Sequence, residues 1–195
     1  MQVLLLGTGM QGKATLHDLV RSDDVGKVIA ADLDVAALED HVRDAGYGDK
    51  VRCERVDATE PGSVDRLMQL QPDVVVDLLP VDFIGTVARA AVSGGAHLVN
   101  AFYVVPELEE LAEAAQAREL TILPEFGMDP GIDLVLLGHA VRAVDDVTDV
   151  ITYGAGFPEE DAADNALKYR VTWTFHGVLK SYYRAGRIIR DGETV

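Results

Sequence analysis

Short apolar runs alternate with amphipathic stretches along residues 1–126. The first run is Val3-Leu4-Leu5-Leu6, and the stretches between successive runs have the apolar spacing of helices. This alternation is typical of a parallel sheet with covering helices. The run Val74-Val75-Val76 is apolar on both faces, as a central strand must be when helices cover both sides of the sheet. We therefore predict a doubly wound α/β fold for residues 1–126.

The bounds of the predicted elements follow from periodicity and turn residues. Six strands are predicted, at residues 3–6, 27–31, 51–56, 73–79, 97–100 and 121–123. Helices are predicted after Gly12 and at residues 36–45, 61–70, 83–92 and 106–118. Residues 127–195 are expected to hold a linker helix, from Gly131 to about Val144, and the beginning of a second α/β domain. Its expected elements are strands at 147–153 and 169–174, a helix at 175–183, and residues 188–195 with a turn at Asp191-Gly192.

A glycine-rich loop lies between the first predicted strand and the first predicted helix. Its sequence is Gly7-Thr8-Gly9-Met10-Gln11-Gly12. The first glycine of such a loop allows a tight turn, the second lets a pyrophosphate approach the backbone, and the third lets the helix pack closely. The helix N-terminus then favours a phosphate without a basic side chain. The loop predicts a Rossmann-like dinucleotide-binding domain, with Gly7, Gly9, Met10, Gln11 and Gly12 as cofactor-binding residues. The alternative is that the glycines only form a turn.

Asp32 lies at the end of the second predicted strand, twenty residues after Gly12. A carboxylate at this position accepts hydrogen bonds from the ribose hydroxyls of NAD and repels the 2′-phosphate of NADP. NAD is therefore favoured. NADP stays an alternative, because a nearby arginine such as Arg21 could hold the phosphate.

Ligands of doubly wound sheets bind beyond the carboxyl ends of the strands. The third predicted strand is followed by Asp57 and Ala58, and we expect Asp57 to approach the adenine edge. The fourth is followed by Leu79 and Pro80, which we expect to form an apolar wall beside the nicotinamide. The alternative for each residue is a turn or a helix cap.

Asp129 is the second candidate for site chemistry. It precedes Pro130, which disfavours helical geometry at Asp129, and the linker helix follows at once. We therefore expect Asp129 to be the N-cap of that helix, with its side chain aimed at the cleft. Its alternative role is the cap alone.

The later motifs resemble the saccharopine dehydrogenase-like family, particularly saccharopine reductases and lysine 6-dehydrogenases. The motifs are Asp129-Pro130-Gly131-Ile132-Asp133, the upstream Tyr103-Val104-Val105-Pro106 and the downstream Tyr153-Gly154-Ala155-Gly156-Phe157-Pro158. Further matches are Asp164-Asn165, Tyr169, Trp173 and Gly177-Val178-Leu179, so the resemblance covers the whole chain.

The resemblance implies an oxidoreductase that acts on the C–N bond of an amino acid such as lysine or saccharopine. Hydride would pass to the nicotinamide, and the resulting imine would be hydrolysed by water. By position, Tyr103 and Asp129 match residues of the nicotinamide and substrate site, and we expect them to orient the amine or handle its proton. Phe102, Met128 and Trp173 match the wall beside the cofactor.

Three residues depart from the family pattern. Gly154 replaces a cysteine that many of the reductases carry, Phe102 replaces a small hydroxyl residue, and Ala166 replaces the proline after Asp-Asn. Asp32 itself favours the members that use NAD. Family members are also roughly twice as long, by analogy. The chain is therefore expected to be a fragment; the alternatives are completion as a homo-oligomer, such as a dimer, or a non-catalytic NAD-binding module. Residues 127–195 would be the linker helix and an incomplete substrate or dimerisation domain.

The composition and net charge of the chain limit the classes of partner that it can bind. The chain has 195 residues and a formal net charge of −16, which argues against nucleic acid or an anionic membrane as a partner. A small amino acid is the expected substrate. Cys53 is the single cysteine, which excludes an intramolecular disulfide, and no residue spacing suggests a metal site. The N-terminal apolar run is too short for a signal peptide or a membrane span, so a cytoplasmic location is expected.

Overall fold

The computed structural model describes residues 1–171, 175–183, 185–186 and 188–195. The chain forms two compact units, Met1–Gly154 and Ala155–Val195. The predicted boundary between residues 126 and 127 stays a prediction.

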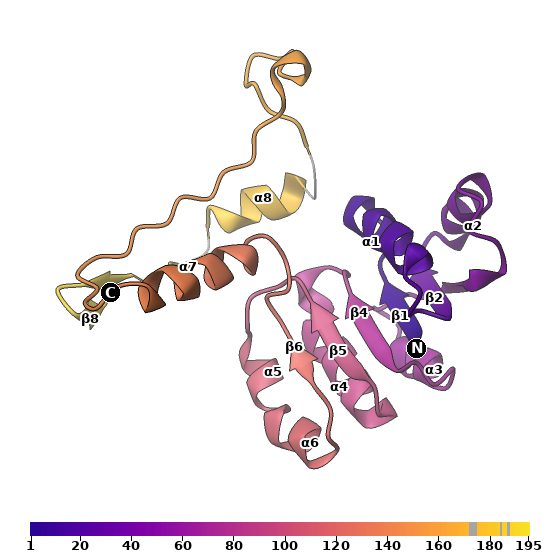
Figure 1. Ribbon diagram of the computed structural model, residues 1–195. Helices are drawn as coiled ribbons and strands as arrows, with labels where there is room; N and C mark the ends of the chain where they lie inside the picture. The colour runs from indigo at the N-terminus through magenta and orange to yellow at the C-terminus, as the bar shows by residue number, and fades with distance from the viewer. Residues whose placement is uncertain (172–174, 184, 187) are drawn as a thin grey trace. The chain divides into compact units, whose positions relative to one another are not determined.

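A six-stranded parallel sheet forms the core of the first unit (Figure 1). The strands run in the order β3-β2-β1-β4-β5-β6, so the strand order reverses between β1 and β4. Their bounds are β1 Gln2–Leu6, β2 Lys27–Asp32, β3 Val51–Arg55, β4 Val74–Asp77, β5 His97–Asn100 and β6 Ile122–Leu123. This order is that of a Rossmann-like sheet, in which ligands bind at the reversal point. The predicted doubly wound fold is confirmed.

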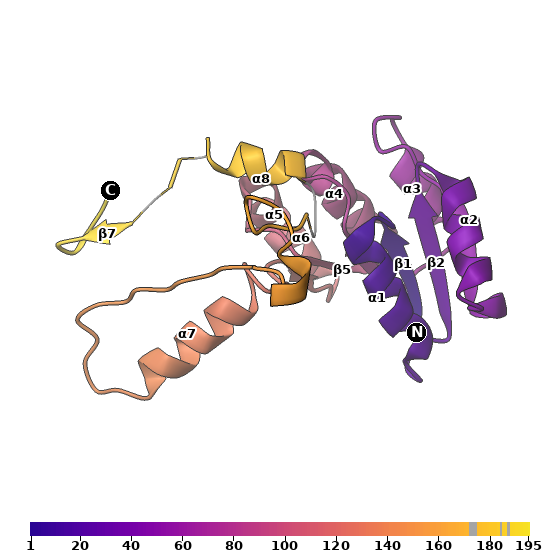
Figure 2. The same cartoon turned by 90° about the horizontal axis from the view of Figure 1, so that it is seen from above.

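Helices cover both faces of the sheet (Figure 2). The bounds are α1 Met10–Arg21, α2 Val35–Asp44, α3 Ser63–Met68, α4 Ile84–Gly94, α5 Pro106–Glu109 and α6 Ala112–Ala117. Leu16 of α1 and Leu38 of α2 are buried against one face, together with Leu5. Val64 of α3 and Val87 of α4 are buried in the core on the opposite face. The alternation of strand side chains therefore divides the core into two apolar layers.

The helix predicted at residues 106–118 is divided in two. Leu111 lies between α5 and α6, and its backbone N–H bonds the Leu108 carbonyl three residues back. This tighter turn brings Leu108 and Leu111 onto the same core cluster. The prediction of one continuous helix was wrong because packing of these leucines outweighs the helical periodicity.

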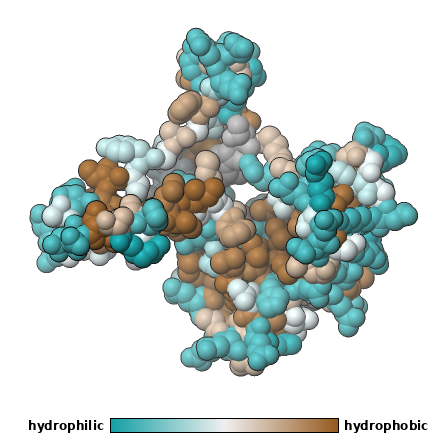
Figure 3. All heavy atoms as spheres, viewed as in Figure 1, coloured by the Kyte–Doolittle hydropathy of each residue, from teal (hydrophilic) through white to brown (hydrophobic). Residues whose placement is uncertain are grey.

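Helices cover the face of β4, β5 and β6 opposite α4 less completely than the rest of the sheet. Val76 and Val99 are half-buried on the face opposite α4, and Leu123 of the edge strand is 41% exposed. Figure 3 shows apolar side chains gathered over β4, β5 and β6. Helix α7, Ile132–Arg142, follows with no buried residue, and Val135 is 70% exposed.

The expected strand at residues 147–153 is absent: these residues are described and form neither a strand nor a helix. Residues 169–171 are likewise not a strand, and 172–174 lie outside the described residues. A strand needs a neighbouring strand for its backbone hydrogen bonds. Within the described residues neither segment has one, which explains why the prediction was wrong.

The second unit has few regular elements. They are the short 3-10 helix η3 (Glu160–Ala162), helix α8 (Phe175–Ser181) and strands β7 (Ile189–Arg190) and β8 (Glu193–Thr194). The two strands pair antiparallel around Asp191-Gly192, whose φ values are +52° and +80°. Both values suit a two-residue hairpin turn. The predicted turn and the helix at 175–183 are thus confirmed, with the helix two residues shorter. Among the described residues, no helix has the length and apolarity that crossing a bilayer requires.

Candidate functional site

The glycine-rich loop joins β1 to α1, and its glycines meet different surroundings. Gly7 has a φ of +87°, and a Cβ there would lie 2.8 Å from the Leu78 carbonyl oxygen. A Cβ at Gly12 would collide with the Gly7 carbonyl oxygen, whereas a Cβ at Gly9 would meet open space. These surroundings fit a tight turn, close helix packing and an open approach to the backbone.

The N-terminus of α1 is suited to an anion. Gly9 is its N-cap residue and provides no side-chain hydrogen bond to the helix. The positive end of the helix dipole is therefore available to a phosphate group. Met10, the first residue of the helix, is 55% exposed. The loop thus fits the pyrophosphate of a nicotinamide dinucleotide, although binding by these residues stays a prediction.

Asp32 ends β2 beside this loop. Its Oδ2 accepts hydrogen bonds from the Thr8 backbone N–H at 2.6 Å and the Thr8 hydroxyl at 2.8 Å. Burial by itself would raise the pKa of the Asp32 carboxyl, but the hydrogen bonds from Thr8 and from the backbone of Asp34 and Leu33 outweigh it and lower the pKa. Asp32 is therefore ionised at neutral pH and fixed against the glycine loop.

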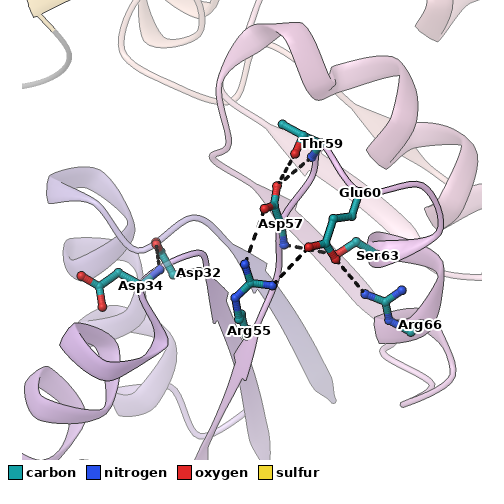
Figure 4. Close-up of polar contacts among 8 residues, drawn as sticks. All are labelled: Asp32, Asp34, Arg55, Asp57, Thr59, Glu60, Ser63 and Arg66. Carbon is teal, nitrogen blue, oxygen red and sulfur yellow. Dashed lines mark hydrogen bonds and ion pairs between the residues drawn. The ribbon is translucent and has the colours of Figure 1, made fainter.

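Arg55 is a neighbour of Asp32 that the sequence analysis missed. The two residues are register partners on the parallel strands β2 and β3. The Arg55 guanidinium lies 3.5 Å from Asp57 Oδ2 and 3.6 Å from Glu60 Oε1 (Figure 4). Its charge is thus shared with two carboxylates. The strand order of a Rossmann-like sheet, applied to the predicted strands, would have placed Arg55 here.

Asp57 is engaged within its own turn. Its Oδ1 accepts hydrogen bonds from the Thr59 hydroxyl at 2.6 Å and the Thr59 backbone N–H at 3.1 Å (Figure 4). The side-chain bond from Thr59 is the main cause of the lowered pKa of Asp57. The neighbouring Ala58 is half-buried. Asp57 therefore has the turn-forming role that was the alternative in the sequence analysis. Its expected contact with adenine stays a prediction.

The residues expected to form the nicotinamide wall differ in exposure. Leu79 and Phe102 are partly buried and pack against the apolar core. Pro80 is exposed, and Met128 is 68% exposed. Trp173 lies outside the described residues. Among the described candidates, Leu79 and Phe102 are thus held in place by the core, and the nicotinamide wall stays a prediction.

Tyr103 and Asp129 come together at the carboxyl edge of the sheet. The Tyr103 hydroxyl donates a hydrogen bond to Asp129 Oδ1 at 2.7 Å. The segments that carry them are joined, because the Glu125 backbone N–H bonds the Phe102 carbonyl at 2.8 Å and Glu125 Oε1 accepts the Val104 N–H at 3.2 Å. The structure therefore places both expected catalytic residues side by side, beyond β5 and β6.

Asp129 is not the N-cap of α7, contrary to expectation. The N-cap residue is Gly131, whose N–H donates to Asp133 Oδ1 at 2.7 Å. The Gly127 N–H also bonds the Pro130 carbonyl, which closes a tight loop with Asp129 inside it. Asp133 satisfies the helix start, so the Asp129 carboxylate is directed to Tyr103 instead. On its other side, a Cβ at Gly154 would lie 3.1 Å from Asp129 Oδ2.

Two family models and several known proteins match this chain over nearly its whole length. Residues 3–123 match the family model of the saccharopine dehydrogenase NADP binding domain, and residues 127–195 match that of the saccharopine dehydrogenase C-terminal domain. The saccharopine dehydrogenase (NADP(+), L-glutamate-forming) of Saccharomyces cerevisiae is 27% identical over 98% of this chain and 42% of the relative. The mitochondrial alpha-aminoadipic semialdehyde synthase of Bos taurus is 26% identical over 100% of this chain and 21% of the relative.

A solved structure has the same fold. The apo saccharopine dehydrogenase (L-Glu forming) from Saccharomyces cerevisiae superposes with a TM-score of 0.77 at 24% identity, over 100% of this chain and 43% of that one. The chain therefore spans less than half the length of these relatives.

Proposed function

Because the chain belongs to the saccharopine dehydrogenase family, we propose that it is the cofactor-binding part of a nicotinamide-dependent dehydrogenase of lysine metabolism. The reaction is oxidation of the C–N bond of an amino acid such as lysine or saccharopine. The observation that carries the proposal is the Tyr103–Asp129 hydrogen bond, at the same sheet edge as the glycine loop. Residues 1–126 bind the dinucleotide, and residues 127–195 begin the substrate or dimerisation domain.

The Tyr103–Asp129 pair suits an amine substrate. A carboxylate binds an ammonium group, and a tyrosine hydroxyl held in a fixed hydrogen bond can exchange a proton with an amine. When bound, the nicotinamide supplies the hydride acceptor. The protein then has to hold the substrate carbon in place and move one proton, and Asp129 and Tyr103 are the groups positioned to do so.

NAD is the proposed cofactor, although the matching domain and the yeast relative are named for NADP. The ionised Asp32 carboxylate would repel a 2′-phosphate. Arg55, the register partner of Asp32 on β3, already faces Asp57 and Glu60. These two carboxylates reduce the attraction that Arg55 would offer to a phosphate.

Amine-dependent reduction of the dinucleotide tests the proposal. The natural protein that carries this chain is mixed with NAD or NADP and with lysine, saccharopine or Nα,Nε-diacetyl-lysine, and the absorbance of the reduced nicotinamide is followed. We expect reduction with NAD and a free or secondary amine, and none with the diacetylated lysine, because both of its nitrogens are amides. Equal reduction with the acetylated compound would contradict the proposed chemistry.

The second candidate is a non-catalytic NAD-binding module. The glycine loop and the ionised Asp32 would serve such a module without any amine chemistry. Tight binding of NAD without reduction by any of these amines would support the module over the enzyme.

Assembly and location stay predictions. The exposed apolar residues of α7, Val135 and Leu136, support a surface that is covered in a homodimer or by further chain. A cytoplasmic location is proposed from the sequence alone. Sedimentation and fractionation of the natural protein test these two points.

A further inference from the structure

Asp77 and Asn100 form a polar pair inside an apolar layer. They end the neighbouring strands β4 and β5, they are register partners, and each is only 1% exposed. The pair two residues earlier in the same register, Val75 and Leu98, is apolar and fully buried. Apolar side chains would fill these positions at lower cost, because burying polar groups requires compensating hydrogen bonds.

Each member makes one local hydrogen bond and leaves one polar atom without a partner. Asp77 Oδ1 accepts the Leu79 N–H at 3.1 Å, and Asn100 Oδ1 accepts the Phe102 N–H at 3.0 Å. The remaining atoms, Asp77 Oδ2 and Asn100 Nδ2, are buried and have no hydrogen-bond partner. When Asp77 is ionised, its Oδ2 is an acceptor and Asn100 Nδ2 is a donor, on adjacent positions of the same sheet face. Each is therefore the natural partner of the other.

The two turns that these side chains shape lead to different parts of the candidate site. After Asp77, the Leu78 N–H bonds the Leu6 carbonyl, and the Leu78 carbonyl oxygen abuts Gly7 of the cofactor loop. After Asn100, the chain passes directly to Tyr103, whose hydroxyl bonds Asp129. The Asp77–Asn100 pair thus lies between the loop that would hold the cofactor and the residues that would handle the amine.

We propose that Asp77 and Asn100 are positioning residues that work as one unit: when a dinucleotide presses on the Gly7–Leu78 contact, Asp77 Oδ2 and Asn100 Nδ2 bond to each other and fix Tyr103 relative to the nicotinamide. Neither residue touches the substrate. The effect on turnover rests on the proposed dehydrogenase function, whereas the coupling between the two side chains does not.

Exchanging the two side chains tests the proposal. Asp77→Asn places two amides opposite each other, Asn100→Asp places two carboxyls there, and the double exchange restores one of each. Every variant keeps an oxygen that can accept the N–H of Leu79 or Phe102, so both turns persist. Asp73→Asn is the matched control, because Asp73 lies at the opposite end of β4, where its Oδ2 accepts the Gln2 N–H.

Turnover, KM, dinucleotide affinity and the thermal unfolding midpoint are measured for wild type, both single variants, the double variant and the control. Displacement of catalytic groups costs turnover more than binding, so we expect each single exchange to lower kcat about tenfold with little change in KM. The double exchange should return kcat to within about threefold of wild type, since contacting residues couple. Asp73→Asn should match wild type.

Single variants that equal wild type, or losses that simply add in the double variant, would overturn the proposal. If Asn100→Asp does not fold, a folded double variant supports the pair and an unfolded one contradicts it. If the wild-type form of the natural protein reduces no dinucleotide with any amine, the dehydrogenase proposal fails on its own. The same variants then test the coupling through dinucleotide affinity and unfolding midpoint, where additivity again contradicts it.

Discussion

The Tyr103 hydroxyl and the Asp129 carboxylate are hydrogen-bonded at 2.7 Å, although 26 positions separate them in the sequence. Their segments follow β5 and β6 and are tied together by backbone hydrogen bonds at Glu125 and Phe126. The parallel sheet therefore builds this pair at its carboxyl edge, on the side of the strand reversal opposite β2 and β3.

Tyr103→Phe and Asp129→Asn should each lower turnover about a hundredfold while leaving NAD affinity within about twofold, because a proton-handling group acts in the chemical step. Steady-state kinetics and calorimetric titration with NAD check this. Tyr47→Phe is the control, since it also removes a hydroxyl that is hydrogen-bonded, here to His17 at 3.2 Å. A loss in Tyr103→Phe no larger than in Tyr47→Phe would exclude Tyr103 from the site.

Asp32→Asn should weaken NAD binding about tenfold and strengthen NADP binding, because the variant loses charge-assisted hydrogen bonds and electrostatic repulsion together. Asparagine still offers an oxygen to the Thr8 N–H, so the loop keeps its support. Asp34→Asn removes the same charge nearby and retains an N-cap oxygen for α2, whose Ala37 N–H it accepts. If both variants change NAD and NADP affinity alike, Asp32 does not select the cofactor.

Gly9→Ala and Gly12→Ala should separate binding from folding. A Cβ at Gly9 meets open space, whereas one at Gly12 collides with the Gly7 carbonyl oxygen. Gly9→Ala should therefore keep the unfolding midpoint and weaken NAD binding, because the new methyl group occupies the approach to the pyrophosphate. Gly12→Ala should weaken NAD binding and also lower the unfolding midpoint. Calorimetric melting and NAD titration measure both, and unchanged NAD affinity in Gly9→Ala would argue against a cofactor at this loop.

Asp77 should make stability depend on pH. Burial raises its pKa from 3.8 to about 7 in the folded protein, against a lowering effect of the Leu79 N–H. Between these two values the unfolded chain has released the proton that the folded protein retains, so rising pH favours unfolding. The loss approaches about 4 kcal/mol above pH 7. Urea unfolding across this range should show stability falling more steeply with pH in wild type than in Asp77→Asn; parallel curves would contradict the raised pKa.

The parts of the site that lie within one continuous segment of the chain could be predicted from the sequence. The glycine loop and Asp32 belong to one continuous strand–loop–helix–strand segment, whose spacing sets its geometry. Asp129 was expected to cap α7, but Asp133 accepts the N–H of the N-cap residue Gly131, a choice that depends on how the 127–131 loop closes. A local pattern could not decide between two nearby carboxylates.

Relationships between strands were harder to predict. Arg55 lies beside Asp32, and Asn100 beside Asp77, only through the register of parallel strands. Their sequence neighbourhoods do not differ from those of ordinary strand ends. The expected strand at residues 147–153 failed for the converse reason, because apolar alternation makes a strand only where another strand accepts its hydrogen bonds.

Transfer of a labelled hydride tests the central claim most directly. The natural protein that carries this chain is incubated with NAD and an amino acid substrate deuterated at each carbon that bears the reacting nitrogen, and the reduced dinucleotide is analysed by mass spectrometry. The account predicts that the reduced nicotinamide carries the deuterium, and that Asp129→Asn suppresses its formation without preventing NAD binding. Bound NAD that acquires no deuterium would contradict a dehydrogenase acting on the C–N bond.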